Sequence, residues 1–242
     1  MTSFFFELCA ESVGAARAAE LGGADRIELC SGLSEGGTTP QAELMNACAR
    51  AVSIPVYVLI RPRAGDFVFD SHEFDLMRRQ IDEAKTAGAS GVALGLLFAD
   101  GSVDIDRTRA LVEYARPLVT TFHRAFDETP DLSAALEQVI ETGAAGLLTS
   151  GGAAEVLQGA ERIGQLQQQA DGRIHIIAGG GLRLASLVEV VRRSGAFSLH
   201  GSLTNSNGSA GNEVDRTELE ANIREAVRLL RSEYDQMAAQ AQ

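Results

Sequence analysis

The feature that most constrains the fold is a regular alternation of short apolar runs with longer segments of helical periodicity. The short runs favour strands, and in the segments between them apolar residues recur at helical spacing. The expected strands cover residues 4–9, 25–30, 55–60, 91–97, 118–122, 146–149, 173–178 and 196–200. The expected helices cover residues 12–21, 40–51, 73–87, 106–115, 132–142, 154–169, 182–194 and 218–237.

Eight strands alternating with eight helices predict an α/β protein of the (β/α)8, TIM-type barrel architecture. A doubly wound open sheet is the alternative, but eight regular units fit a closed barrel better. The chain has 242 residues, a length that such a barrel can use as a single domain. No low-complexity linker divides the chain, so we expect one domain over residues 1–242.

Two segments are expected to depart from this regular pattern. Residues 203–214 are rich in glycine, serine and asparagine, which predicts a flexible loop after the eighth strand, either a lid or a plain connection. The tail from about residue 235 is expected to be frayed. Glycine should also end several helices in a left-handed conformation, at the Gly-Ala steps within residues 21–25, 87–90, 142–145 and 194–197.

The charge balance excludes some partners. The chain carries 33 acidic and 21 basic side chains, for a net charge of −12, and Lys85 is the only lysine. Nucleic acid and anionic membranes are therefore not expected as partners, because a polyanion binder needs a cationic surface. The many arginines are better explained by bidentate recognition of a carboxylate or phosphate.

The compartment is indicated by the amino terminus and the cysteines. Residues 1–7 lack the basic start of a signal peptide, and no apolar run is long enough to span a membrane. Three cysteines are an odd number, so we expect free thiols in the cytoplasm rather than structural disulfides. Cys48 lies in the middle of an expected helix and is assigned to packing.

A repeated Glu-Leu-Cys triplet marks the ends of the first two strands. Glu7 and Cys9 share one face of the first strand, and Glu28 and Cys30 share one face of the second. Since the apolar face must pack on the helices, all four side chains should point into the barrel. Two neighbouring sulfurs would select Cu(I) or Zn(II). Barrel stagger could instead separate them, and a buried cysteine can also be a small core residue.

Charged residues follow the third and fifth strands, where the active face of such a barrel lies. Arg61 and Arg63 are expected to bind an anion, with Asp66 beside them at the mouth. After the fifth strand, His123 is a candidate general acid or base. Its neighbours complete the expected group: Arg124 as an anion clamp and Asp127 as a mouth residue.

Glycine-rich turns follow the last three strands. Their backbone N–H groups could hold phosphate, which TIM-type barrels often bind after the seventh and eighth strands. The candidate anion-binding residues here are Gly151, Gly180, Gly201 and Ser202. His200, at the end of the eighth strand, is expected at the mouth.

These motifs together resemble the CutC family of copper homeostasis proteins. The resemblance rests on residues 7–9, 22–30, 35–40, 60–67, 121–127, 148–152 and 200–202. It implies a TIM-type barrel, a cytoplasmic homodimer or higher homo-oligomer, and a part in handling intracellular copper. It also implies Cu(I) binding by the thiolates of Cys9 and Cys30, and no nucleotide cofactor is indicated.

Two functions follow from these observations. In the first, which we adopt, the protein handles copper through the two mouth thiols. In the second, the chain is a lyase, isomerase or hydrolase acting on a small anionic, phosphorylated substrate. There the arginines and glycine turns would bind charge, and Glu7, Glu28 or His123 would move protons.

Overall fold

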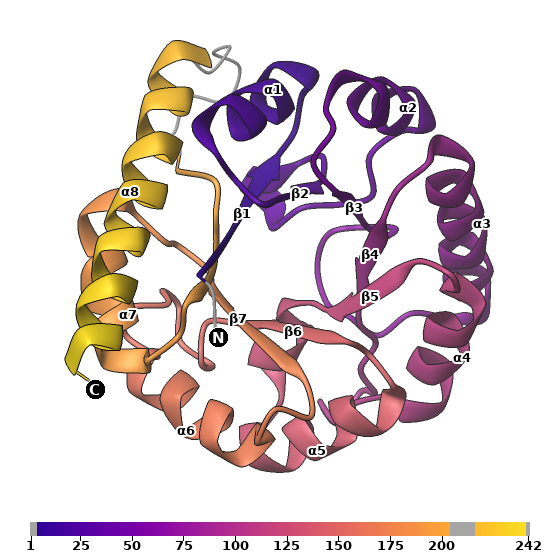
Figure 1. Cartoon of the computed structure of the whole chain (residues 1–242). Helices are drawn as coiled ribbons and strands as arrows, with labels where there is room; N and C mark the ends of the chain where they lie inside the picture. The colour runs from indigo at the N-terminus through magenta and orange to yellow at the C-terminus, as the bar shows by residue number, and fades with distance from the viewer. Residues whose placement is uncertain (1–3, 204–215, 241–242) are drawn as a thin grey trace.

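The computed structural model describes residues 4–203 and 216–240, which form a closed barrel of parallel strands inside a ring of helices (Figure 1). The strands run in chain order around the barrel, and the last pairs with the first. They are β1 (Phe5–Ala10), β2 (Arg26–Leu29), β3 (Val56–Leu59), β4 (Gly91–Leu94), β5 (Val119–Phe122), β6 (Gly146–Thr149), β7 (His175–Gly179) and β8 (Ser198–Gly201). The predicted barrel is confirmed.

One main helix follows each strand. The helices are α1 (Val13–Gly22), α2 (Ala42–Ala51), α3 (Ser71–Ala87), α4 (Ile105–Ala115), α5 (Leu132–Thr142), α6 (Ala160–Ala170), α7 (Leu187–Ser194) and α8 (Arg216–Gln240). The long α8 packs beside α7 and α1, where the two ends of the ring meet (Figure 1). It continues as a helix to Gln240, whereas the sequence predicted a frayed tail from residue 235. The predicted loop at residues 203–214 lies, apart from Leu203, outside the described residues.

The predicted glycine stops are confirmed. Each of the four Gly-Ala steps has a glycine in the left-handed region at the end of a helix: Gly23, Gly88, Gly143 and Gly195. Two helices begin at least five residues later than predicted. α6 starts at Ala160 rather than 154, because the preceding segment folds over the turn after β7, where Val156 N–H donates to Gly180 O at 2.7 Å. Before α7, a short 3-10 turn (Leu184–Ser186) replaces the first predicted helical residues.

The main apolar core lies between the strands and the helices. Phe6 and Leu8 of β1 are fully buried in it, as are Ile27 and Leu29 of β2. Because side chains alternate along a strand, the residues between them face the barrel axis. The apolar packing of one strand face therefore forces the Glu-Leu-Cys glutamates and cysteines into the interior.

Candidate metal site in the barrel mouth

The two mouth thiols are in contact. Cys9 Sγ and Cys30 Sγ lie 3.3 Å apart, and both side chains are buried. Cys9 pairs in register with Glu28, so Cys30, which directly follows β2, lies further along the chain, and the two sulfurs meet diagonally. The stagger of the barrel thus brings the thiols together instead of separating them. Leu59 and Ala93 pack against the pair from the next two strands.

An imidazole and a carboxylate join the thiol pair. Cys9, Glu28 and His200 each offer one ligand atom, and these atoms lie within 4.8 Å of one another, all from buried residues. The sequence placed His200 at the mouth without linking it to the cysteines. The link depends on closure of the barrel, which sets His200 beside Glu7 through the pairing of β8 with β1. We call Cys9, Cys30, Glu28 and His200 the thiol cluster.

Glu7 is fixed by two neighbours below the thiol cluster. His200 Nδ1 lies 2.8 Å from Glu7 Oε1, and the Arg26 guanidinium forms an ion pair with the other oxygen. Burial raises the pKa of Glu7, but hydrogen bonds and charges from His200 and Arg26 outweigh it and lower the pKa to about 2. Glu7 is therefore a permanent carboxylate that orients His200, and it does not suit the proton-transfer role that the sequence suggested.

Arg26 was missed by the sequence reasoning, although it shares a strand face with Glu28 and Cys30. Its guanidinium carbon lies 3.9 Å from the centre of the Tyr57 ring and 4.8 Å from that of Phe5. This stack fills the barrel beneath Glu7. Period-two alternation could have placed Arg26 inside the barrel, and the buried glutamates required a cation there.

Three groups of the thiol cluster, His200, Glu28 and Cys9, hold protons more tightly than usual. Burial lowers the pKa of His200, but its hydrogen bond to Glu7 and the charges of Glu28 and Glu7 outweigh burial and raise it. Burial is the largest cause that raises the pKa of Glu28, to about 7, and the charge of Glu7 adds to it against those of His200 and Arg26. The pKa of the Cys9 thiol is raised by its hydrogen bond with Cys30, by burial and by nearby negative charge. A metal bound here must therefore displace protons.

The donor set fits a soft metal ion. Two sulfurs and an imidazole are ligands typical of Cu(I) and Zn(II) sites. The hydrogen bond from His200 Nδ1–H to Glu7 leaves Nε2 as the nitrogen that can ligate, and such a carboxylate–histidine pair is the usual support for a metal-bound histidine.

The terminal nitrogens of Arg61 and Arg63 bind groups within the chain. The Arg61 side chain is buried, and its terminal nitrogens donate to the carbonyls of Glu35, Gly37 and Gly65, which ties the loops after β2 and β3 together. Arg63 pairs with Asp66 and Glu73 near the surface. Neither terminal guanidinium group converges on the thiol cluster, because loop carbonyls and carboxylates in the chain already accept from them.

The backbone N–H groups of the turn after β6 donate to a carboxylate of the protein itself. The buried Asp127 carboxylate accepts from Ser150 N–H at 3.0 Å and Gly152 N–H at 3.0 Å, and it pairs with Arg124 Nε at 2.9 Å. Gly151 N–H donates to Thr149 Oγ1 at 2.8 Å. Asp127 and Thr149 thus accept from Arg124 Nε and Gly151 N–H within the chain, and anion binding by Gly151 and Arg124 stays a prediction.

The remaining predicted residues lie near these groups. Gly180 packs on Arg124, since a Cβ built there would lie 2.9 Å from Arg124 Cζ. Gly201 belongs to β8 and pairs with Leu8 rather than forming a turn, and Ser202 follows it half-buried. His123 is buried at the start of a short 3-10 helix (Arg124–Glu128), where Nδ1 accepts from Ala125 N–H at 3.2 Å.

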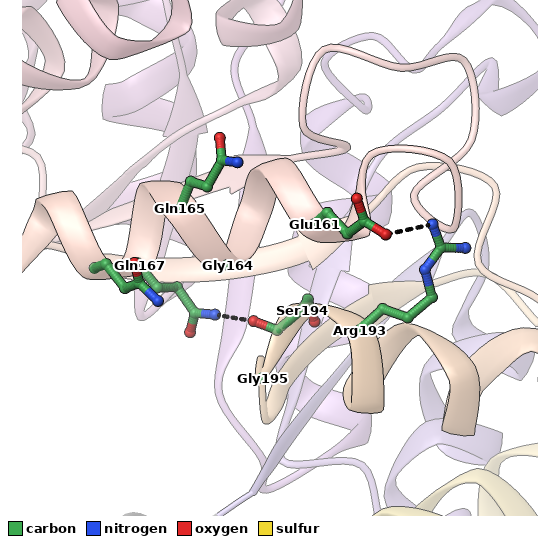
Figure 2. Close-up of a pocket in the computed structure, with 8 residues that line it drawn as sticks. Glu161, Gly164, Gln165, Gln167, Arg193, Ser194 and Gly195 are labelled. Carbon is green, nitrogen blue, oxygen red and sulfur yellow. Dashed lines mark hydrogen bonds and ion pairs between the residues drawn. The ribbon is translucent and has the colours of Figure 1, made fainter.

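A groove outside the barrel shares no residue with the mouth. It lies between α6 and α7 and is lined by Glu161, Gly164, Gln167, Arg193, Ser194 and Gly195, among others (Figure 2). Its polar groups already bind one another: Arg193 pairs with Glu161 at 3.2 Å, and Gln167 Nε2 donates to Ser194 O at 2.8 Å. The groove therefore offers no chemistry comparable to that of the mouth.

Comparison with known proteins agrees with the family that the sequence motifs resemble. The family model of the CutC family matches residues 4–205. A human protein named copper homeostasis protein cutC homolog is 46% identical over 197 residues, covering 81% of this chain and 72% of that protein. A family protein CutC of Caulobacter vibrioides is 47% identical over 196 residues, covering 81% of this chain and 80% of that protein.

Solved structures place the chain among TIM-type barrels. A crystal structure described as a putative copper homeostasis protein CutC of Streptococcus agalactiae has a TM-score of 0.78 at 28% identity, covering 83% of this chain and 99% of that one. An aldolase with a TM-score of 0.64 is 15% identical, covering 93% of this chain and 94% of that one, and shares the fold alone.

The fold and the site define a single-domain (β/α)8 barrel with a buried thiol–imidazole cluster at its mouth. The chain belongs to the CutC family. Among the residues that the structure describes, no helix is both long enough and apolar enough to cross a membrane.

Proposed function

We propose that this protein takes part in copper homeostasis by binding Cu(I) through the thiolates of Cys9 and Cys30. The observation that carries the proposal is the 3.3 Å contact between the two sulfurs beside His200. Cu(I) is a soft ion that prefers thiolate and imidazole ligands. Human and mouse relatives are named copper homeostasis protein cutC homologs, which agrees with this assignment.

Each member of the thiol cluster has a distinct part in this proposal. Cys9 and Cys30 provide the thiolates, and His200 provides a third donor whose ring is oriented by Glu7. The pKa of Glu28 is near neutrality. Its carboxyl group can therefore take up a proton that a thiol releases when Cu(I) binds, or release its own proton to solvent. Burial shields the sulfurs from water and from oxidants in solution. This suits Cu(I), which such oxidants would convert to Cu(II).

The experiment is an anaerobic titration of the reduced, metal-free protein with Cu(I) against a strong competing chelator. The Cys9→Ser, Cys30→Ser and double variants should bind far more weakly than the wild type. Cys48→Ala is the matched control, because this third buried cysteine lies in α2, away from the mouth. Unchanged affinity in the double variant would refute the proposal.

The proposal includes a cytoplasmic location and a homodimeric or higher homo-oligomeric state. Three free cysteines, all buried, suit a reducing compartment. The assembly rests on the family resemblance, and light scattering of the purified chain tests it. A monomer at micromolar concentration would contradict that part of the proposal without affecting the copper site.

A further inference from the structure

Two buried N–H groups at the mouth have no acceptor among the described residues. They belong to Arg61 Nε and His123 Nε2, on side chains that are 5% and 4% exposed. His123 Nδ1 accepts from Ala125 N–H, so the proton of the neutral ring lies on Nε2, and Nε2 is a donor. Leaving two such donors without an acceptor costs free energy, which indicates a ligand or solvent oxygen at this position.

The two donors come from the same level of the barrel. Leu59, Ala93 and Thr121 pair in register across β3, β4 and β5. Two residues further along the chain, just past the ends of these strands, are Arg61, Gly95 and His123. Gly95 has no side chain, and the rings of His123 and Phe122 fill the space above it. The His123 ring leans into that space, because a Cβ on Gly95 would lie only 2.9 Å from His123 Nδ1.

Phe67 contacts the side chains that carry both donors. Its ring centre lies 4.7 Å from Arg61 Cζ and 4.9 Å from the centre of the His123 ring. The ring itself is 9% exposed, and it lies on the loop after β3. Phe67 therefore forms an apolar wall beside both side chains.

The electrostatic environment selects an anion. Burial lowers the pKa of His123, and the positive charges of Arg61 and Arg124 lower it further, to about 3. The ring therefore remains a neutral donor at physiological pH, next to the fixed charge of Arg61. The terminal nitrogens of Arg61 already bind loop carbonyls, so the guanidinium is held rigidly and Nε keeps its direction.

We propose that Arg61 Nε and His123 Nε2 bind an oxyanion, the carboxylate or phosphate group of a small ligand, beside Phe67. The site goes beyond the copper proposal, because it uses no residue of the thiol cluster. Leu59 and Ala93 lie one level below it, between the donors and the sulfurs. It is the place where the small anion of the enzymatic alternative would be held.

The test uses metal-free, reduced, full-length protein with acetate and inorganic phosphate as two separate probes, at constant ionic strength set with sodium chloride. The ¹H–¹⁵N signals of Arg61 Nε–H and His123 Nε2–H report the site directly. Saturable shifts of both signals with acetate identify a carboxylate site, and saturable shifts with phosphate identify a phosphate site.

Two variants separate the donor from its structural role. His123→Asn keeps an acceptor for Ala125 N–H in place of Nδ1 but removes the Nε2 donor, and it should weaken probe binding about tenfold or more, the effect of one hydrogen bond to a charged group. His72→Asn, at an exposed position at the start of α3, is the matched control and should bind like the wild type.

The proposal is overturned if neither probe gives a saturable shift, since an ordered water then suffices for the two donors. It is also overturned if His123→Asn binds the probe as tightly as the wild type. Should His123→Asn fail to fold, the Arg61 Nε–H signal of the wild type still decides between these outcomes. None of these results depends on whether copper binds.

Discussion

His200 Nδ1 and Glu7 Oε1 are hydrogen-bonded at 2.8 Å across the seam where β8 closes the barrel against β1. The two residues are separated by almost the whole length of the chain, yet this bond sets the direction of the imidazole. Glu7 also neutralises Arg26. One carboxylate therefore holds both the arginine packed beneath it and the histidine of the thiol cluster.

Glu7→Gln should be strongly destabilising. The substitution leaves Arg26, which is 9% exposed, without its counter-charge. Breaking a buried ion pair in this way costs about 3–5 kcal/mol. We expect a loss of this size in the free energy of unfolding, measured by urea denaturation of the metal-free protein. Weaker Cu(I) binding should accompany it, because the His200 ring loses its acceptor.

Glu137→Gln is the matched control for this prediction. Its carboxylate also pairs with an arginine, Arg173, but on the exposed surface. Removing it should leave the urea midpoint nearly unchanged, because exposed ion pairs contribute little. Equal destabilisation by the two substitutions would show that burial is not what makes the Glu7 pair important.

Glu28 should make the metal-free protein less stable as the pH rises. Its pKa is about 7 in the folded state against an ordinary value of 4.5, so the folded state holds the proton more tightly than the unfolded chain does. The resulting stabilisation is complete below pH 4.5 and is lost as the pH rises through 7, by about 3 kcal/mol.

Glu28→Gln should abolish that loss. We expect the difference in unfolding free energy between wild type and variant to change across pH 4.5–7 in urea titrations, with the variant gaining relative stability at the upper end. A difference that is independent of pH would contradict the raised pKa of this carboxyl group.

His123 should make the protein less stable as the pH falls, which is the opposite of the effect of Glu28. Its pKa is about 3 when folded against an ordinary value of 6.5, so the unfolded state binds the proton first. Stability is therefore complete above pH 6.5 and falls as the pH is lowered, by about 1.5 kcal/mol between pH 6.5 and 5. His123→Asn should lack this contribution, which urea titrations of both proteins at several pH values would reveal. Parallel curves for the two proteins would refute it.

Asp127→Asn should loosen the turn after β6. The carboxylate accepts from two backbone N–H groups, those of Ser150 and Gly152, and an amide cannot replace it without turning a donor toward them. We expect a loss of about 1–3 kcal/mol in the free energy of unfolding. Hydrogen exchange at Ser150 and Gly152 should accelerate.

Asp131→Asn is the control for the Asp127 prediction. Asp131 caps α5 from an exposed position, and asparagine caps a helix as well as aspartate does. Exchange at Ser150 and Gly152 should stay at the wild-type rate in this variant. Acceleration in both variants would mean that the turn does not depend on the Asp127 carboxylate.

Most of the fold could be predicted because its determinants are local. The alternation of strand and helix patterns and the glycine stops are properties of neighbouring residues. The late start of α6 could not be predicted, because the segment before it is held by a bond from Val156 to Gly180, far along the chain.

Only the features of the site that follow from the alternation of side chains along a strand could be predicted from the sequence. Two Glu-Leu-Cys triplets and two inward faces placed Cys9 and Cys30 inside the barrel, and the structure brings their sulfurs together. The roles of the arginines depend on loop carbonyls, whose positions follow from tertiary structure. For that reason Arg61 could be placed at the mouth, while its contacts with Gly37 and Gly65 could not be foreseen.

The stack of Arg26 on Tyr57 and Phe5 has a consequence for the route by which a metal ion reaches the thiols. Since the guanidinium and the two rings pack together beneath Glu7, we expect an ion bound by Cys9 to enter and leave from the side of the loops that follow the strands. Under the copper proposal, delivery and removal would then take place in turn, by exchange with a donor or acceptor that presents its own ligands on that side.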